Sequence, residues 1–328
     1  GYHCRVGGRP PFSQDELGRI EARMREIVGS DAPYVKSIVP VERAVALFSD
    51  RGQHDTARLL AHRQKETVAL YSLRDHPIYS HGYMVPSAGY LRHFALDAFP
   101  PGFMLRFPHQ GRPGEIPPAA PYPKLFAVFE EAGRWLDRLG VRNAGALNDA
   151  VAGDGLQRIS LVAEALHEAR IAQIAAQIAD AHDRIRVVLV AGPSSSGKTT
   201  FSKRLAIQLL ALGVRPFPQS LDDDFLDREQ TPLDAHGQPD YEGLAALDVP
   251  LLDRQLLSLM SGESVQLPHY DFVTGKRRPG PTVTLEPDHV LILEGIHGLN
   301  PELVESLPPE RLYKIYVSAL TQLNLDRH

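Results

Sequence analysis

Cysteine is the scarcest reactive residue of this 328-residue chain, because Cys4 is the only one. A single thiol excludes an internal disulfide framework and a zinc site built on cysteines. Proteins without disulfides are typical of reducing compartments, so we expect a cytoplasmic protein.

Long apolar runs are also missing. No stretch approaches the roughly 20 residues that a membrane-spanning helix needs, and no signal-peptide pattern opens the chain, so we expect no membrane partner. Positive charge is not in surplus, since the formal net charge is −5. That balance argues against a broad nucleic-acid surface and leaves Lys276-Arg277-Arg278 as the candidate basic patch.

A glycine-rich segment, Gly-Pro-Ser-Ser-Ser-Gly-Lys-Thr-Thr, occupies residues 192–200. The β-branched run at 184–191 predicts a buried strand before it, and the apolar spacing over 201–212 predicts a helix after it. Strand, glycine loop and helix in this order are the context of a phosphate-binding P-loop, G-x-x-x-x-G-K-[ST]. The alternative, a glycine-serine turn with an exposed lysine, is disfavoured by these flanking elements. We therefore expect an α/β P-loop NTPase fold, in which helices flank a parallel sheet.

This loop predicts how a nucleoside triphosphate is held. Its glycines permit conformations that turn N–H groups toward phosphate oxygens, and the helix N-terminus adds partial positive charge. Lys198 is expected to reach the β- and γ-phosphates, and Thr199 to offer its hydroxyl to Mg²⁺. ATP and Mg²⁺ are thus the expected cofactors. The expected nucleotide-binding residues are Gly192, Ser194, Ser195, Ser196, Gly197, Lys198, Thr199 and Thr200.

An acidic run, Asp222-Asp223-Asp224, follows a second strand-like segment at 218–221. Strand ends of a parallel sheet lie at its ligand-binding edge. One of these carboxylates could therefore orient an attacking hydroxyl or accept its proton. The alternative is that the run caps a following helix.

A third buried-strand pattern, residues 289–293, ends at Glu294. An acid at the tip of a core strand beside a P-loop is the Walker-B arrangement, which holds Mg²⁺ directly or through water. We expect Thr199 and Glu294 to be the metal-binding residues. A solvated strand end is the alternative.

Two further segments carry candidate acceptor-binding residues. Aromatic rings at 268–272 precede the basic residues 276–278, a combination that could grip an acceptor. An exposed hairpin with solvated charges is the alternative. The acidic groups of 240–242 could bind sugar hydroxyls, or they could belong to an ordinary surface loop.

The chain divides into three expected regions. Residues 1–107 form a smaller α+β domain, whose first helix is marked by the capping box of Ser13 and Glu16. Residues 108–183 form a proline-rich linker and a helical connector, the latter indicated by apolar helical spacing. Residues 184–328 form the P-loop domain.

The segments GPSSSGKTT, SLDDDF, DYE…LD, PHYDFVTGKR and VLILEGIHGL, in this order, resemble the uridine kinase and phosphoribulokinase family of P-loop kinases. The resemblance implies transfer of the γ-phosphate of ATP to a ribose-type hydroxyl. It implies that Asp222 is the catalytic aspartate, with Lys198 and Thr199 on the phosphates and Mg²⁺, and Glu294 as the Walker-B acid. Glu242 falls at a sugar-contacting position and Tyr270 at a base-contacting one. The expected acceptor-binding residues are Asp223, Glu242, Tyr270 and Arg277.

The chain departs from this family at two places. Gly275 stands where uridine kinases place a base-reading histidine, so the identity of the acceptor stays open. The family also implies an arginine-rich lid after the strand-like run 313–317, where Arg327 is the only arginine. We therefore expect this form to lack its lid, to bind ATP and to turn over slowly.

Residues 1–107 resemble the editing-type second domain of threonyl-tRNA synthetases, through PFSQDELGRIEARMREIV, VERAVALFSDRG and YSHGYMVPSAGYLRHFAL. Ser80 and Met84 replace a cysteine and a histidine of that editing pocket, so editing chemistry is not expected. The remaining histidines, His76, His81 and His93, are expected to be ordinary core or surface residues. A chain carrying both domains resembles bacterial fusion proteins of the nucleoside kinase type.

Two functions from different classes stay open. The first is an ATP- and Mg²⁺-dependent kinase that acts on a nucleoside or a related sugar, and retention of Asp222 and Glu294 favours it. The second is an ATP-gated module that binds RNA or a component of translation. We expect a small-molecule acceptor rather than nucleic acid as the partner. Homo-oligomerisation and the role of His297 are left open.

Overall fold

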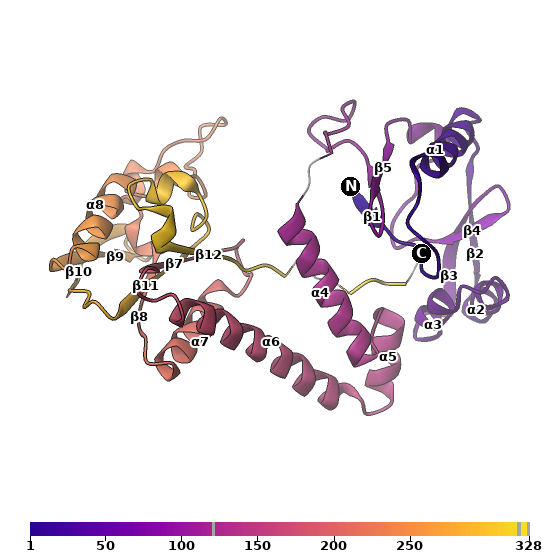
Figure 1. Ribbon diagram of the computed structural model, residues 1–328. Coiled ribbons are helices and arrows are strands. Elements are labelled where there is room, and N and C mark those ends of the chain that lie inside the picture. Colours follow the sequence, from indigo (N-terminus) through magenta and orange to yellow (C-terminus); the bar gives the residue numbers. More distant parts are fainter. Residues whose placement is uncertain (120–121, 320–322, 327–328) are drawn as a thin grey trace. The chain divides into compact units, whose positions relative to one another are not determined.

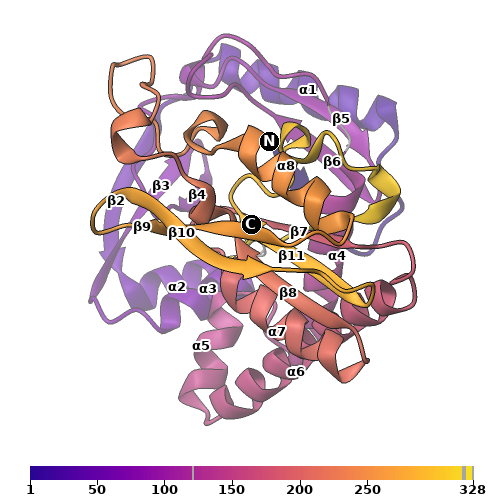
Figure 2. The same cartoon turned by 90° about the vertical axis from the view of Figure 1, so that its left-hand side faces the viewer.

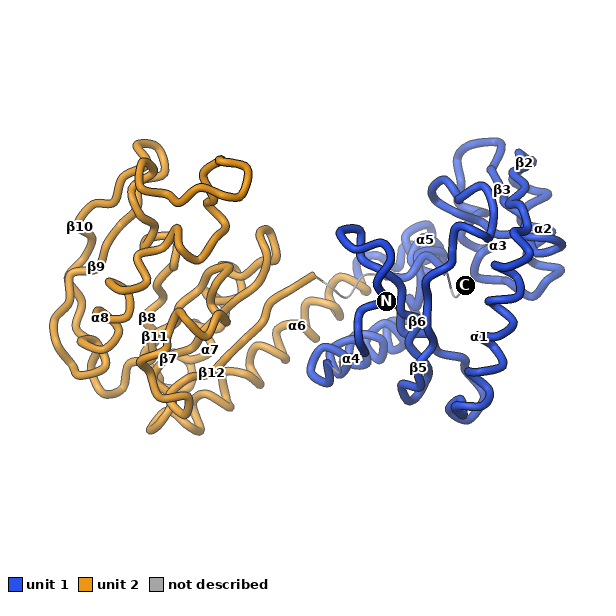
Figure 3. The backbone as a smooth tube through the Cα atoms, turned by 90° about the horizontal axis from the view of Figure 1, so that it is seen from above, with its two compact units in different colours: residues 1–157, 323–328 blue, residues 158–322 orange. Residues whose placement is uncertain are grey.

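The computed structural model describes residues 1–119, 122–319 and 323–326 (Figure 1, turned by 90° in Figure 2). Arg327, which bears on the expected lid, lies outside the described residues. The chain forms two compact units: residues 1–157 together with the segment from Leu323, and residues 158–322 (Figure 3). Within the described ranges, no helix has the length and apolar character needed to cross a membrane.

Unit 1 is an α+β domain with two antiparallel three-stranded sheets, in the strand orders β2-β3-β4 and β1-β6-β5. The expectation of a separate α+β domain is thereby confirmed. Its strands are β1 (Tyr2–Cys4), β2 (Tyr34–Pro40), β3 (Thr67–Leu73), β4 (His76–Tyr79), β5 (Ala95–Phe99) and β6 (Gly102–Arg106). Its helices are α1 (Gln14–Gly29), α2 (Val41–Asp50), α3 (His54–Ala61), α4 (Pro123–Leu139) and α5 (Ala144–Ala152).

The start of α1 confirms the expected capping box. The Glu16 N–H donates to Ser13 Oγ (3.2 Å), and the Ser13 N–H donates to Glu16 Oε2 (2.9 Å). These two bonds satisfy N–H groups that a helix terminus leaves without an internal partner. Helix α5 was not expected. It begins at Asn143, whose side chain accepts from the Ala146 N–H (2.9 Å).

Unit 2 is built on a four-stranded sheet in the order β12-β7-β11-β8, and every neighbouring pair in it is parallel. This arrangement confirms the expected P-loop sheet flanked by helices. The strands are β7 (Val187–Ala191), β8 (Arg215–Ser220), β11 (His289–Gly295) and β12 (Leu312–Tyr316). The helices are α6 (Leu156–Ala179), α7 (Lys198–Ala211) and α8 (Val249–Met260). A two-stranded hairpin, β9 (Val265–Asp271) and β10 (Lys276–Val283), completes the unit.

Alternate residues of the central strands feed two apolar layers. Val188 and Val190 of β7 pack with α6 and α7 on one face, whereas Val187 and Leu189 pack with α8 on the other. All four side chains are fully buried. Burial on both faces explains why the strand reads as an unbroken apolar run. Helix α6, which the sequence suggested as a connector, buries Ile171, Ala175 and Ile178 in the first layer.

Candidate functional site

The loop at 192–200 joins the carboxyl end of β7 to the first turn of α7. Gly192 is buried, and a Cβ built on it would lie 2.0 Å from the Val317 carbonyl oxygen. The Val317 N–H in turn donates to Ala191 O (2.7 Å), so this segment is tied to β7. Ser195 (φ +59°) and Gly197 (φ +87°) adopt the left-handed conformation that reverses the chain. The backbone therefore has the tight fold expected of a phosphate cradle.

Two groups of this loop are available to a phosphate. Ser196 Oγ is buried and has no hydrogen-bond partner within the described part of the chain. Lys198 Nζ donates to the Pro193 carbonyl oxygen of its own loop (3.1 Å). The N-terminus of α7 also presents N–H groups without helical partners. A hydroxyl, an ammonium group and a helix N-terminus thus converge, a donor set that fits an anionic triphosphate.

Thr199 and Glu294 are brought into direct contact. Thr199 Oγ1 donates a hydrogen bond to Glu294 Oε1 at 2.8 Å. The sheet register explains the meeting, since Glu294 pairs with Val190 of β7 and so lies at the edge where the loop begins. Hydroxyl and carboxylate oxygens are hard ligands of the kind Mg²⁺ takes. Among the described residues, no group of three or more His, Cys, Asp or Glu side chains is arranged to hold a metal ion.

Asp222 lies in the one-turn 3₁₀ segment η2 (Leu221–Asp224), directly after β8. Its pKa is raised, first by desolvation and then by the negative charge of Glu294, while Lys198 acts in the opposite direction. The sheet register places Asp222 at the same edge as Glu294, because Ser220 of β8 pairs with Glu294 of β11. The Asp222 N–H is held by Ser220 Oγ (3.3 Å), so the serine rather than the acidic run makes the cap. The alternative reading, an aspartate run capping a helix, is wrong because η2 is a single turn that Ser220 caps.

Asp223 supports the hairpin. Its Oδ1 accepts the Tyr270 N–H (3.1 Å) and contacts His269 Nδ1 (2.9 Å). Both hydrogen bonds tie η2 to β9. The geometry makes Asp223 a residue that positions Tyr270, a role that its place in the acidic run did not reveal.

Asp224 is fully buried, with one carboxylate oxygen unpartnered within the described residues. Gln219 Nε2 donates to the other oxygen (3.4 Å). Burial, followed by the charge of Asp223, raises the pKa of Asp224 to about 7. The three neighbouring aspartates thus have three different environments.

Tyr270 is nearly buried in an aromatic cluster. Its ring lies 5.0 Å from Phe272 and 5.6 Å from Phe225, centroid to centroid. Arg277, opposite Tyr270 on β10, forms an ion pair from Nη1 to Asp248 Oδ2 (2.8 Å). Its main visible role is therefore to join the hairpin to the start of α8. Glu242 is exposed, and no hydrogen bond joins its side chain to the other candidate residues in the described ranges.

His297 lies in the turn after β11, and its Nε2 is buried without a partner among the described residues.

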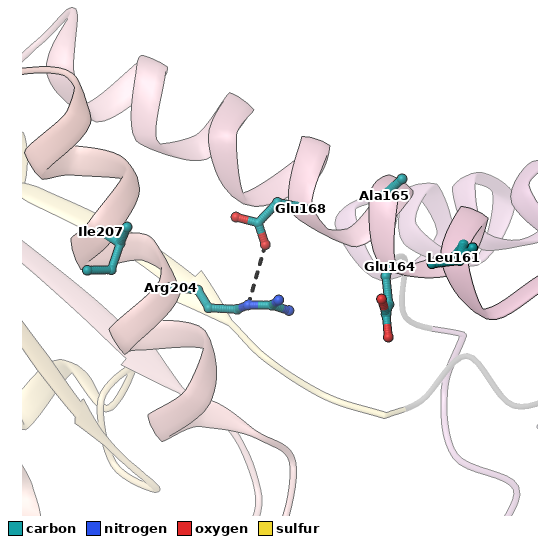
Figure 4. Close-up of a pocket in the computed structure, with 6 residues that line it drawn as sticks. All are labelled: Leu161, Glu164, Ala165, Glu168, Arg204 and Ile207. Atoms are coloured by element: carbon teal, nitrogen blue, oxygen red, sulfur yellow. Dashed lines mark ion pairs between the residues drawn. The ribbon is translucent and has the colours of Figure 1, made fainter. Parts of the chain in front are cut away.

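A separate hollow of about 450 Å³ lies between α6 and α7 and includes Glu168, Arg204 and Ile207 (Figure 4). The ion pair from Arg204 Nε to Glu168 Oε2 (3.4 Å) crosses it. None of the expected site residues lines this hollow.

Known proteins resemble both parts of the chain. Residues 187–328 match the family model for the phosphoribulokinase / uridine kinase family. A uridine kinase of Deinococcus deserti is 36% identical over 139 residues, which cover 42% of this chain and 64% of that protein. A uridine kinase of Lactobacillus helveticus is 33% identical over 127 residues, 39% of this chain and 59% of that protein. The chain thus spans about three fifths of the length of these relatives.

A threonine–tRNA ligase of an Acidovorax species is 34% identical over 97 residues, which are 29% of this chain and 15% of that protein. Among solved structures, one described as a possible uridine kinase from Bacillus stearothermophilus is 24% identical. It aligns over 40% of this chain and 70% of that chain, with a TM-score of 0.33. The family match over residues 187–328 thus falls on the part of the chain that contains the parallel sheet and the glycine-rich loop.

Proposed function

We propose that the protein transfers the γ-phosphate of ATP to a hydroxyl group of a nucleoside or a related sugar. The observation that carries the proposal is the sheet register: Lys198 follows β7, Glu294 lies near the end of β11 and Asp222 follows β8, and these three strands are parallel neighbours. A phosphate-binding cation, a metal-binding acid and a third carboxylate are the groups that phosphoryl transfer needs.

The P-loop would hold the donor. Its N–H groups, Lys198 and the Ser196 hydroxyl would neutralise and orient the triphosphate. Thr199 and Glu294 would hold Mg²⁺, which when bound supplies positive charge to the phosphate oxygens. Because the transferred group carries spread negative charge, such positioning and electrostatic stabilisation provide most of the catalysis.

Asp222 would act on the acceptor. Its carboxylate would accept a hydrogen bond from the attacking hydroxyl and take its proton as the bond to phosphorus forms. A raised pKa makes it a stronger base than an ordinary aspartate. Asp223 would fix the hairpin that carries Tyr270, against which the rest of the acceptor would lie.

We also propose that the functional boundaries run at 1–107, 108–183 and 184–328.

The similarity to a threonine–tRNA ligase supports a second candidate function, an ATP-gated module that binds RNA or a translation component. The two candidates differ in one measurable respect. A kinase releases ADP in proportion to acceptor, whereas a gated module hydrolyses ATP independently of any small acceptor.

The test is ADP release with Mg²⁺, ATP and a panel of nucleosides and sugars, for the wild type and for Asp222→Asn. Loss of a positioned base typically costs about 10²–10⁴-fold in rate, so the variant should lose acceptor-dependent release by that factor. Glu263→Gln, an exposed acid after α8, is the matched control. ADP release that ignores both the acceptor and the Asp222 substitution would refute the kinase.

A further inference from the structure

Arg228 covers the turn between β9 and β10. Gly275, in that turn, is buried and has φ +68°. A Cβ built on Gly275 would lie 2.7 Å from Arg228 Nε and 2.8 Å from Arg228 Cζ. The guanidinium group therefore occupies the space that a side chain at position 275 would need.

Two hydrogen bonds to backbone carbonyl oxygens hold Arg228 in this place. Its N–H donates to Gly275 O (2.8 Å), and its Nη2 donates to Phe272 O (2.8 Å). The neighbouring Asp227 accepts the Arg277 N–H at Oδ1 (2.8 Å), which adds a third link between this segment and the hairpin. A guanidinium group carries five N–H donors, and the bond to Phe272 uses one of them. Because Arg228 is exposed, the other donors can reach a ligand.

A set of contacts leads from Arg228 to Asp223, the residue next to the candidate catalytic Asp222. The Phe272 ring, 59% exposed, packs edge-on against Tyr270. The Tyr270 N–H is bound by Asp223, the residue next to Asp222. An acceptor whose hydroxyl lies at Asp222 would thus extend past these rings toward Arg228.

We propose that Arg228 is a specificity-determining residue of the acceptor site, which selects acceptors that present oxygen lone pairs at the end remote from the reacting hydroxyl. The inference rests on the proposed kinase function. Guanidinium donates hydrogen bonds and accepts none, so it pairs with a carbonyl edge, a carboxylate or a phosphate and opposes an amino group. The exposed Phe272 ring beside it offers a surface for a planar group.

The test compares acceptors that differ at this end: uridine against cytidine for a carbonyl edge, and ribose 5-phosphate against ribose for an anionic group. Whichever pair the wild type phosphorylates, we expect it to prefer uridine over cytidine, or ribose 5-phosphate over ribose. Arg228→Ala should lower the kcat/KM for the preferred acceptor by about ten- to a hundred-fold, mainly through KM. Arg228→Glu should reverse the preference, because a carboxylate accepts from an amino group and repels a phosphate.

Gly275→Ala provides an independent variant, since its added Cβ must displace the guanidinium and should reproduce the effect of Arg228→Ala. Arg254→Ala, an exposed arginine on α8, should leave the preference unchanged. If turnover depends on the acceptor but the preference is the same in the wild type, Arg228→Ala and Arg228→Glu, the specificity role of Arg228 is overturned. The proposed kinase function is not affected by that result. Absence of acceptor-dependent turnover in the wild type would overturn the proposed function and this inference with it.

Discussion

Thr199 Oγ1 donates a hydrogen bond to Glu294 Oε1 over 2.8 Å and thereby joins the first turn of α7 to the end of β11. In the proposed function these two residues would hold Mg²⁺. We predict that Glu294→Gln weakens ATP binding by about tenfold or more when Mg²⁺ is present, because an amide carries no charge for the ion. Titration of a fluorescent ATP analogue with and without Mg²⁺ measures this. Glu302→Gln, in an exposed turn, should bind as the wild type does, and equal affinities for all three proteins would contradict the metal role.

Lys198 donates to its own loop, at Pro193 O (3.1 Å). In the proposed function it would exchange that carbonyl for phosphate oxygens, a charge-assisted interaction. We predict that Lys198→Ala weakens ATP binding by about ten- to a hundred-fold, whereas Lys203→Ala, an exposed lysine of the same helix, does not. Calorimetric titration with ATP measures the affinity of each variant. Similar affinity losses in both variants would indicate a general effect of charge rather than direct contact.

Gly192 has no space for a side chain, because its Cβ would lie 2.0 Å from the Val317 carbonyl oxygen. Because that neighbour is a backbone atom rather than the end of a flexible side chain, it cannot move aside at little cost. We predict that Gly192→Ala lowers the free energy of unfolding by about 2 kcal/mol or more through strain and overpacking. Chemical denaturation followed by hydrogen exchange of the β7 amides reports on this unit.

Gly133→Ala is the comparison for that experiment. Gly133 lies within α4, and a Cβ there would meet nothing within 4 Å. The change should be neutral or stabilise its helix by up to about 1 kcal/mol. Equal stability of Gly192→Ala and the wild type would show that the contact with Val317 can relax at no cost.

Asp224 predicts a dependence of stability on pH. Its pKa rises from 3.8 to about 7 on folding, so the folded chain holds a proton that the unfolded chain has released between these values. Stability therefore falls as the pH increases from about 4 to about 7, by up to about 4 kcal/mol at 1.36 kcal/mol per pKa unit. Asp224→Asn, which is never charged, should remove this decline.

The measurement is denaturant unfolding of wild type and Asp224→Asn at pH 5 and pH 8, again followed at β7. The variant should gain stability relative to the wild type at the higher pH. Asp183→Asn, an exposed residue of the same unit, should follow the wild type at both values. Parallel curves for wild type and Asp224→Asn would show that Asp224 titrates normally.

Local patterns predicted the parts of the structure that depend on neighbours in the chain. The capping box of Ser13 and Glu16 and the strand–loop–helix around 192–200 were found where expected, since each is specified within a few residues. Helix α5 was not predicted, because an asparagine such as its N-cap, Asn143, is as typical of a turn as of a helix start. The candidate site residues were likewise chosen by motif, and their roles stay predictions.

Contacts between distant segments could not be predicted in this way. The local pattern of the run Asp222-Asp223-Asp224 does not show that its three carboxylates have different surroundings. Only the register of β8 beside β11, together with the docking of β9 on η2, separates them. Likewise, the sequence shows that position 275 has no side chain, but it does not show what fills the space. The structure shows that the guanidinium group of Arg228, 47 positions earlier in the sequence, fills it.

The sequence by itself determined the phosphate loop, the alternation of strands and helices, and the acid that ends β11, because glycine placement, periodicity and strand ends are local properties. The tertiary structure decided which acid meets Thr199, which aspartate is buried, and which arginine lies against Gly275. Those outcomes depend on strand order and register, which bring residues far apart in the chain within hydrogen-bond distance.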